Sequence, residues 1–273
     1  MKNGGSERVI RTIALCFATA LAVVIISGIV YTGCFILRVV GFVAGEEAGG
    51  TITYSEEFSG VTSLYLDCEV GEIIIRQGSD DAVRVEAKNA ESKLQTNQSG
   101  NALTVGLKDH NFFSFLSQSV LIITVPEDAI LEELTVKVDL GRVVLEDISV
   151  QRLTAKSDLG SVEAERLHTS DSTLMEVGLG MLRVRNSTLK NPDLKGGLGL
   201  VEVKGDLSGS GRAEIGIGAL ELSLQGSRED YELVMDMGLG GSNLESYTGP
   251  YASNAAKLLL KNGIGGATVQ FYQ

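Results

Sequence analysis

Few residues of this 273-residue chain have side chains suited to catalysis or metal binding. It has two histidines, His110 and His168, and neither has a second His or Cys at the spacing of a zinc site. Of the three cysteines, Cys16 and Cys34 lie in an apolar N-terminal segment, so the rest of the chain has no disulfide framework. Cys68 occupies an apolar position of an alternating pattern, and we expect a buried, inert thiol there. The sequence therefore predicts no catalytic residue, metal or cofactor.

Charged side chains recur four residues before a repeated glycine, and we call this set the charged column. Its members in sequence order are Asp67, Lys137, Lys156, Glu176, Lys195, Glu214, Asp236 and Lys261. The signs alternate from Lys156 to Glu214, as opposite-charge neighbours on adjacent strands would require. We hypothesise an ionic docking face in which Lys156, Glu176, Lys195 and Glu214 contact a partner. The alternative is a solvated face that only keeps the sheet soluble.

A second candidate contact is the segment Glu245-Ser246-Tyr247-Thr248-Gly249-Pro250-Tyr251. It lies in the longest interval between repeats, and such insertions loop out of a repeat stack and often bind partners. Tyr247, Pro250 and Tyr251 are the predicted contact residues. Ordinary variation in loop length is the alternative.

These residues are positioned by a repeat whose mark is a short phrase ending in glycine. The phrase occurs at 139–141, 158–160, 178–180, 197–199, 216–218, 238–240 and 263–265, with an isolated copy at 69–71. The closely spaced final glycines are 19, 20, 19, 19, 22 and 25 residues apart, which is the range of solenoid repeats. We predict an all-β, single-stack parallel β-solenoid (β-helix) with coils of about 19–20 residues, in which successive copies stack.

Each copy has apolar residues five, three and one positions before its glycine and two and four after it. Alternation with a period of two predicts strands that face inward at these positions. The exceptions are Ser157, Gly196, Asn262 and Ser242. The pattern indicates a corner at the glycine, with the preceding aliphatic side chain buried and the glycine facing outward. Glycine also recurs two residues earlier, which would leave either a groove or a strongly twisted backbone.

The N-terminal region has a different organisation. Lys2, Arg8 and Arg11 in residues 1–12 precede an uncharged stretch at 13–37, which is long enough to span a bilayer. Because the basic residues precede this stretch, we expect a cytoplasmic tail at 1–12, a transmembrane anchor at 13–37 and an extracellular remainder. Two alternatives are a signal peptide cleaved near 43–45 and lipidation at Cys34. Residues 38–55 would form a tether.

Residues 56–133 are predicted to form a β region that caps the solenoid repeats of 134–273. Turn signals separate the expected strands, at 61–66, 72–76, 82–87, 102–105 and 120–125. The aromatic cluster at 112–116 is interpreted as a plug over the open end of the stack, with an exposed binding loop as the alternative.

Composition limits the possible partners. Residues 41–273 have 19 basic and 34 acidic side chains, a net charge of −15. Such a surface repels nucleic acid and anionic headgroups, so nucleic-acid binding is excluded as a function. It favours a basic partner.

The repeats and the order of the segments resemble the bacterial putative-adhesin family, a β-strand-repeat domain of unknown function on envelope proteins. The resemblance covers about residues 56–271. It rests on residues 64–75, on the strand 122–126 and on the glycine phrases that follow. It implies a membrane-tethered parallel β-solenoid, a link to envelope-stress responses and no catalytic residues.

We expect a non-enzymatic, membrane-anchored cell-envelope protein. Its exported acidic solenoid would be a rigid scaffold for an envelope protein, a wall polymer or a cationic peptide. The alternative is a polysaccharide-modifying enzyme on a parallel β-helix, although here the outward acids alternate with lysines. Calcium-stabilised repeats are a third possibility, but the turns lack the regular Asp ligands of such coils.

Overall fold

The computed structural model describes residues 52–89, 94–107 and 119–273. The chain divides into two compact units, Met1–Glu46 and Glu47–Gln273, and the described residues belong to the second. The predicted tail at 1–12, the anchor at 13–37, most of the tether, His110 and the aromatic cluster at 112–116 lie outside the described residues. The proposed division of the chain into tail, anchor, tether, cap and repeats therefore stays a prediction.

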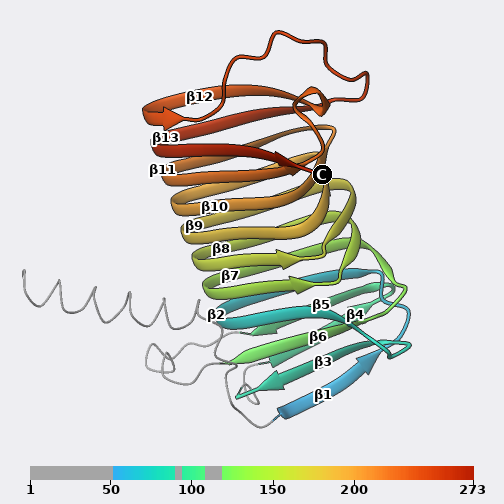
Figure 1. Cartoon of the computed structure of the whole chain (residues 1–273). Helices are drawn as coiled ribbons and strands as arrows, with labels where there is room; N and C mark the ends of the chain where they lie inside the picture. The colour runs from blue at the N-terminus through green and yellow to red at the C-terminus, as the bar shows by residue number, and fades with distance from the viewer. Residues whose placement is uncertain (1–51, 90–93, 108–118) are drawn as a thin grey trace, which may run out of the picture. The chain divides into compact units, whose positions relative to one another are not determined.

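The described part is all-β, as the alternating pattern predicted, and its strands form one long, mostly parallel sheet (Figure 1). A single turn of 3-10 helix, η2 (Arg228–Asp230), precedes β12. The strands are β1 (Ile52–Phe58), β2 (Ser63–Gly78), β3 (Val83–Lys88), β4 (Leu94–Ser99), β5 (Ala102–Leu107), β6 (Val120–Pro126), β7 (Ile130–Glu146), β8 (Ser149–Glu165), β9 (His168–Lys190), β10 (Pro192–Ser208), β11 (Ser210–Gln225), β12 (Tyr231–Ser242) and β13 (Ala256–Tyr272).

Each repeat forms one long, bent strand that pairs in parallel with the strands of the neighbouring coils. Strands β2, β7, β8, β9, β10 and β11 follow one another in this way, which gives the solenoid-like stack of coils in Figure 1. Strands β6, β3 and β1 continue the sheet beyond β2, and the β1–β3 and β3–β6 pairs are antiparallel. At the other end the stack finishes with β12.

The expected strands of the N-terminal region are present, and two further ones were missed. β1 begins at Ile52, so the last four residues of the predicted tether belong to a strand that pairs with β3. β4 runs through Ser99, where turn signals suggested a longer loop, and it forms a hairpin with β5. Both strands are mostly polar and exposed, so they lack the apolar alternation that predicts a strand. Backbone hydrogen bonds to their partner strands place them in the sheet.

The prediction that successive copies stack is wrong at the C-terminal end. β13 inserts between β11 and β12 and pairs in parallel with both. The chain therefore leaves one coil position open, forms β12, and returns through residues 243–255 to fill the gap. This order places Lys261 between Glu214 and Asp236, whereas the sequential order would set those two acids side by side.

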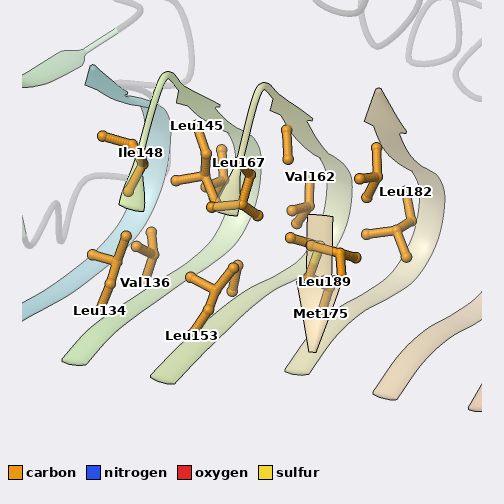
Figure 2. Packing of buried hydrophobic residues seen from close by; sticks show 14 of the residues in the cluster. Leu134, Val136, Leu145, Ile148, Leu153, Val162, Leu167, Met175, Leu182 and Leu189 are labelled. Carbon is orange, nitrogen blue, oxygen red and sulfur yellow. The ribbon is translucent and has the colours of Figure 1, made fainter. Parts of the chain in front are cut away.

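The core lies between the two arms of the coils, where aliphatic side chains from equivalent positions stack on one another (Figure 2). Val136, Val162 and Leu182 are fully buried there. Two of the polar exceptions are buried and hydrogen-bonded. Ser157 Oγ donates to the carbonyl of Gly141, and Asn262 Nδ2 donates to the carbonyl of Gly266. These hydrogen bonds offset the cost of burying Ser157 Oγ and Asn262 Nδ2, whereas Asn262 Oδ1 is buried without a hydrogen-bond partner among the described residues.

The repeated glycines form a column at which the coils approach closely. They pair in register from Gly71 to Gly240, and their φ angles lie between 134° and 153°. A Cβ on Gly160 would lie 1.8 Å from the carbonyl oxygen of Gly141 in the neighbouring coil. The corner therefore requires glycine both for its backbone angle and for its packing. The glycines two residues earlier are also close-packed, since a Cβ on Gly197 would meet the carbonyl oxygen of Gly178 at 2.2 Å.

The side chain before each corner glycine was predicted to be buried, and this prediction is wrong. Leu179, Leu198 and Ile217 are 42%, 48% and 48% exposed, whereas the corner glycine Gly160 is buried. The positive φ of the glycine breaks the alternation, so the two residues before it both face outward. A period of two cannot be continued through such a corner.

Candidate functional site

The charged column is a continuous ladder in the structure. The register pairs its members in the order Asp67, Lys137, Lys156, Glu176, Lys195, Glu214, Lys261 and Asp236. Because β13 lies between β11 and β12, the alternation of sign continues without interruption from Lys156 to Asp236. The sequence had shown it only as far as Glu214.

Ion pairs within the charged column neutralise much of its charge. Lys156 Nζ lies 3.0 Å from Glu176 Oε2, and Lys261 Nζ lies 3.6 Å from Asp236 Oδ2. Lys195 Nζ turns sideways to Asp193 Oδ2 at 3.3 Å. These side chains are partly exposed, so each pair contributes at most about 1 kcal/mol. The column is therefore a solvent-facing surface of alternating charge, not a patch of one sign.

The predicted contact loop is anchored to the end of the stack. Tyr247 and Tyr251 lie side by side with ring centroids 5.1 Å apart, and the Arg228 guanidinium is 4.9 Å from the Tyr247 ring and 5.7 Å from the Tyr251 ring. Tyr247 Oη donates to the carbonyl of Pro250 at 3.1 Å, and the Ala252 N–H donates to the carbonyl of Glu229 at 2.9 Å. The cation–π contacts of Arg228 and the hydrogen bond from Ala252 to Glu229 hold the loop against η2, whereas the bond from Tyr247 to Pro250 lies within the loop. Pro250 and Tyr251 remain exposed.

The structure thus brings together Tyr247, Pro250 and Tyr251, and it brings together Lys156, Glu176, Lys195 and Glu214 in a second group. The first group lies in the loop that follows β12 at the end of the stack, and the second lies along β8 to β11. They are two separate surfaces. Their role in partner contact stays a prediction.

A buried ion cluster was missed by sequence reasoning. Arg142 donates two hydrogen bonds to Glu163, at 3.0 and 2.9 Å, and a third to Glu72 at 3.1 Å. The three side chains are only 11% to 16% exposed. Burial raises the pKa of Glu72 even though Arg142 opposes this. The cluster joins β2, β7 and β8, so it stabilises the stack and is not a free binding site.

Glu202 forms the centre of a similar cluster. Its carboxylate accepts hydrogen bonds from Arg183 at 2.9 Å and from Arg185 at 2.9 Å. Burial opposes its ionisation, but the two arginines outweigh burial and lower the pKa of Glu202 below its ordinary value. The sequence signal for both clusters was opposite charges at the positions just after the corner glycine, on adjacent coils.

The described residues form no cluster of metal-ligand side chains. His168 is exposed at the start of β9, and the described ranges contain no group of three or more His, Cys, Asp or Glu placed to hold a metal ion. A hollow near β12 is lined by Val234, Leu258 and neighbouring residues, and its single carboxylate, Glu232, pairs with Lys257 at 3.4 Å. Paired carboxylates of the kind that cleave glycosidic bonds are not present in this hollow.

The thiol of Cys68 should not react in the folded protein. The side chain is 1% exposed, and burial raises the pKa of Cys68 to about 12. Because the thiolate is the nucleophile, we expect iodoacetamide to modify Cys68 at least about a hundredfold faster in denaturant than under native conditions. Mass spectrometry of the peptide containing Cys68 measures both rates. An engineered Ile130→Cys chain, cysteine at a 63% exposed position, provides the reactive control, and equal native rates at both sites would contradict burial.

Within the described ranges, no helix is both long and apolar enough to cross a membrane. The predicted anchor at 13–37 lies outside those ranges, so anchoring stays a prediction.

Comparison with known proteins gives one family match. The family model described as Toastrack DUF4097 matches residues 61–238, from the start of β2 into β12, which is more than half of the chain. No curated protein matches it significantly.

Similar solved structures include a putative cell adhesion protein from Clostridium sporogenes, with 13% identity and a TM-score of 0.43, covering 82% of this chain and all of that one. A putative adhesin from Parabacteroides merdae has 16% identity and a TM-score of 0.41, covering 83% of this chain and 98% of that one. A putative adhesin from Bacteroides fragilis has 16% identity and a TM-score of 0.35, covering 82% of this chain and all of that one.

Proposed function

The chain belongs to the Toastrack family DUF4097, the putative-adhesin family of unknown function, and from that premise we propose that it is a non-enzymatic, membrane-anchored protein of the cell envelope. Its exported part would be an acidic β-solenoid that acts as a rigid, adhesin-like scaffold and binds a basic partner. That partner is an envelope protein, a wall polymer or a cationic peptide, and the link of the family to envelope stress extends to this chain.

The observation that supports this proposal is the acid excess on a stack of coils. The net charge of −15 on residues 41–273 attracts cations over distances of several ångströms. The stack is held by continuous parallel pairing from β2 to β12, so its outward side chains keep fixed spacings. A surface of this kind suits binding better than turnover.

Binding of a basic peptide should depend strongly on salt. We expect a Lys/Arg-rich peptide to bind the purified full chain at low ionic strength. Binding should weaken about tenfold or more towards physiological salt, because the Debye length falls to about 8 Å. Titration by fluorescence anisotropy measures this, and an acidic peptide of equal length is the control. Equal binding of both peptides, or binding that ignores salt, would contradict the proposal.

The contact surfaces can be located in cells. A photo-crosslinking residue at Pro250, at Lys195 or at the control position Ile130 would be introduced into the full chain, and captured neighbours compared with and without envelope stress. We expect capture at Pro250 or Lys195 and none at Ile130. Capture at the control position alone would remove both predicted contact surfaces.

Anchoring and catalysis have separate tests. Protease added to intact cells should digest the part after residue 40 while the chain stays in the membrane fraction after a carbonate wash. Release by carbonate would contradict the anchor. Turnover of wall glycans by the purified chain would contradict the non-enzymatic role.

A further inference from the structure

The exposed aliphatic residues before the corner glycines lie in one line along the stack. Five of the nine large hydrophobic side chains that are exposed in the described part belong to this line. We call the line from β8 to β12 the apolar strip. In spatial order its residues are Leu159, which is half-buried, and the exposed Leu179, Leu198, Ile217, Ile264 and Leu239. Scattered exposed leucines need no explanation, but a continuous line of them marks an interaction surface.

The surroundings of the apolar strip keep it open. From β9 to β12 the residue before each strip residue is a glycine, whereas Asp139 and Asp158 occupy the equivalent positions in β7 and β8. On the other side, Met181 and Leu200 are half-buried and widen the apolar surface. The C-terminal half of the stack therefore presents aliphatic side chains with little polar cover.

The charged column beside the apolar strip has a symmetry that identifies a partner. Its six members over the same coils alternate as Lys156, Glu176, Lys195, Glu214, Lys261 and Asp236. When the order of these six is reversed, every position carries the opposite sign. The column is therefore complementary to its own reversed copy, which is the condition for an isologous contact.

We propose that two copies of this chain associate through the apolar strip, with their stacks antiparallel and the two-fold axis between β10 and β11. A two-fold axis that runs parallel to the strands, and so perpendicular to the stack, sets each column of one copy opposite the same column of the other, in reverse order. Lys195 then faces Glu214 of the second copy, Glu176 faces Lys261, and the aliphatic strips meet.

The sign pattern selects this arrangement among the alternatives. Shifting the axis by half a coil, onto a single strand, would bring like charges together along the whole column, which disfavours that register. An axis parallel to the stack would not place the charged column opposite itself. The association does not depend on the basic partner proposed above.

Exchanging one charge in each of two chains tests the proposal. Lys195→Glu places Glu against Glu in a self-pair, and Glu214→Lys places Lys against Lys. A mixture of the two variants restores opposite charges at both central contacts. With two differently tagged full chains, we expect co-purification to fall at least about fivefold for either variant with itself and to return within about twofold of wild type on mixing.

Controls separate association from folding. Recovery on mixing cannot arise from changes inside one chain, since each variant keeps its own intramolecular neighbours. Ile217→Asp should abolish pairing, whereas Ile130→Asp, at an exposed position outside the strip, should leave it unchanged. Arg183→Glu and Glu202→Arg reverse the two charges of an ion pair on the other arm of the coils. Co-purification of either variant with itself should show no loss that is recovered when the two variants are mixed. Wild-type chains that never co-purify, an Ile217→Asp chain that still pairs, or a mixture no better than its components would overturn the proposal.

Discussion

Replacing Gly160 with alanine should lower the free energy of unfolding by about 3 kcal/mol or more. Gly160 has a φ of 140°, which a residue with a Cβ rarely adopts, and the added Cβ would lie 1.8 Å from the carbonyl oxygen of Gly141. The obstacle is backbone of the next coil, so it cannot be relieved by rotating a side chain. Gly160→Val and Gly199→Val should be at least as harmful. Thermal unfolding followed by circular dichroism measures the change.

The same substitution at Gly266 is the matched control. Gly266 also lies in a strand, one residue after a corner glycine, but a Cβ there meets no atom within 4 Å. Gly266→Ala should change the free energy of unfolding by less than about 0.5 kcal/mol relative to wild type. The position has room for a Cβ, and alanine lowers the conformational entropy of the unfolded chain. If Gly160→Ala and Gly266→Ala melted at the same temperature, the corner would not need glycine.

The glycine spacing predicted the fold because it is set by the coil itself. One coil adds one strand to a parallel sheet, so a period near 19 residues and an alternation of two together indicate stacked parallel strands. Cys68 was predicted to be buried, and Ser157 was recognised as an exception, from the same alternation. Local pattern and long-range pairing agree wherever the backbone stays in the β region.

The rest could not be predicted because it depends on geometry that the pattern does not contain. The exposure of Leu198 follows from the φ of Gly199, which breaks the alternation. The position of β13 depends on a chain reversal through residues 243–255. The sequence prediction stacked the repeats in their order along the chain and therefore did not include this reversal. The Glu72 partner of Arg142 comes from the isolated copy of the repeat, 70 residues upstream.

Arg142→Ala should also cost about 3 kcal/mol of unfolding free energy, because it leaves two buried carboxylates facing each other without their cation. Glu72 and Glu163 each lie within 3.1 Å of the guanidinium and are 11% and 16% exposed. The control is Arg152→Ala. Arg152 pairs with Glu133 at 3.6 Å on the surface, with the side chains 49% and 33% exposed, and its loss should cost less than about 1 kcal/mol.

The cost of Arg142→Ala should depend on pH, and the sign follows from the carboxylates. Burial already raises the pKa of Glu72 with Arg142 present, and removing the arginine must raise it further. A carboxyl group whose pKa is higher in the folded than in the unfolded state favours folding when protonated, and its destabilising effect grows as pH rises through the folded pKa. The free energy of unfolding that Arg142→Ala loses relative to wild type should therefore be larger near pH 7 than near about pH 5. Urea unfolding at both values measures it. A deficit that is independent of pH would mean that lost packing, not unpaired charge, explains the effect.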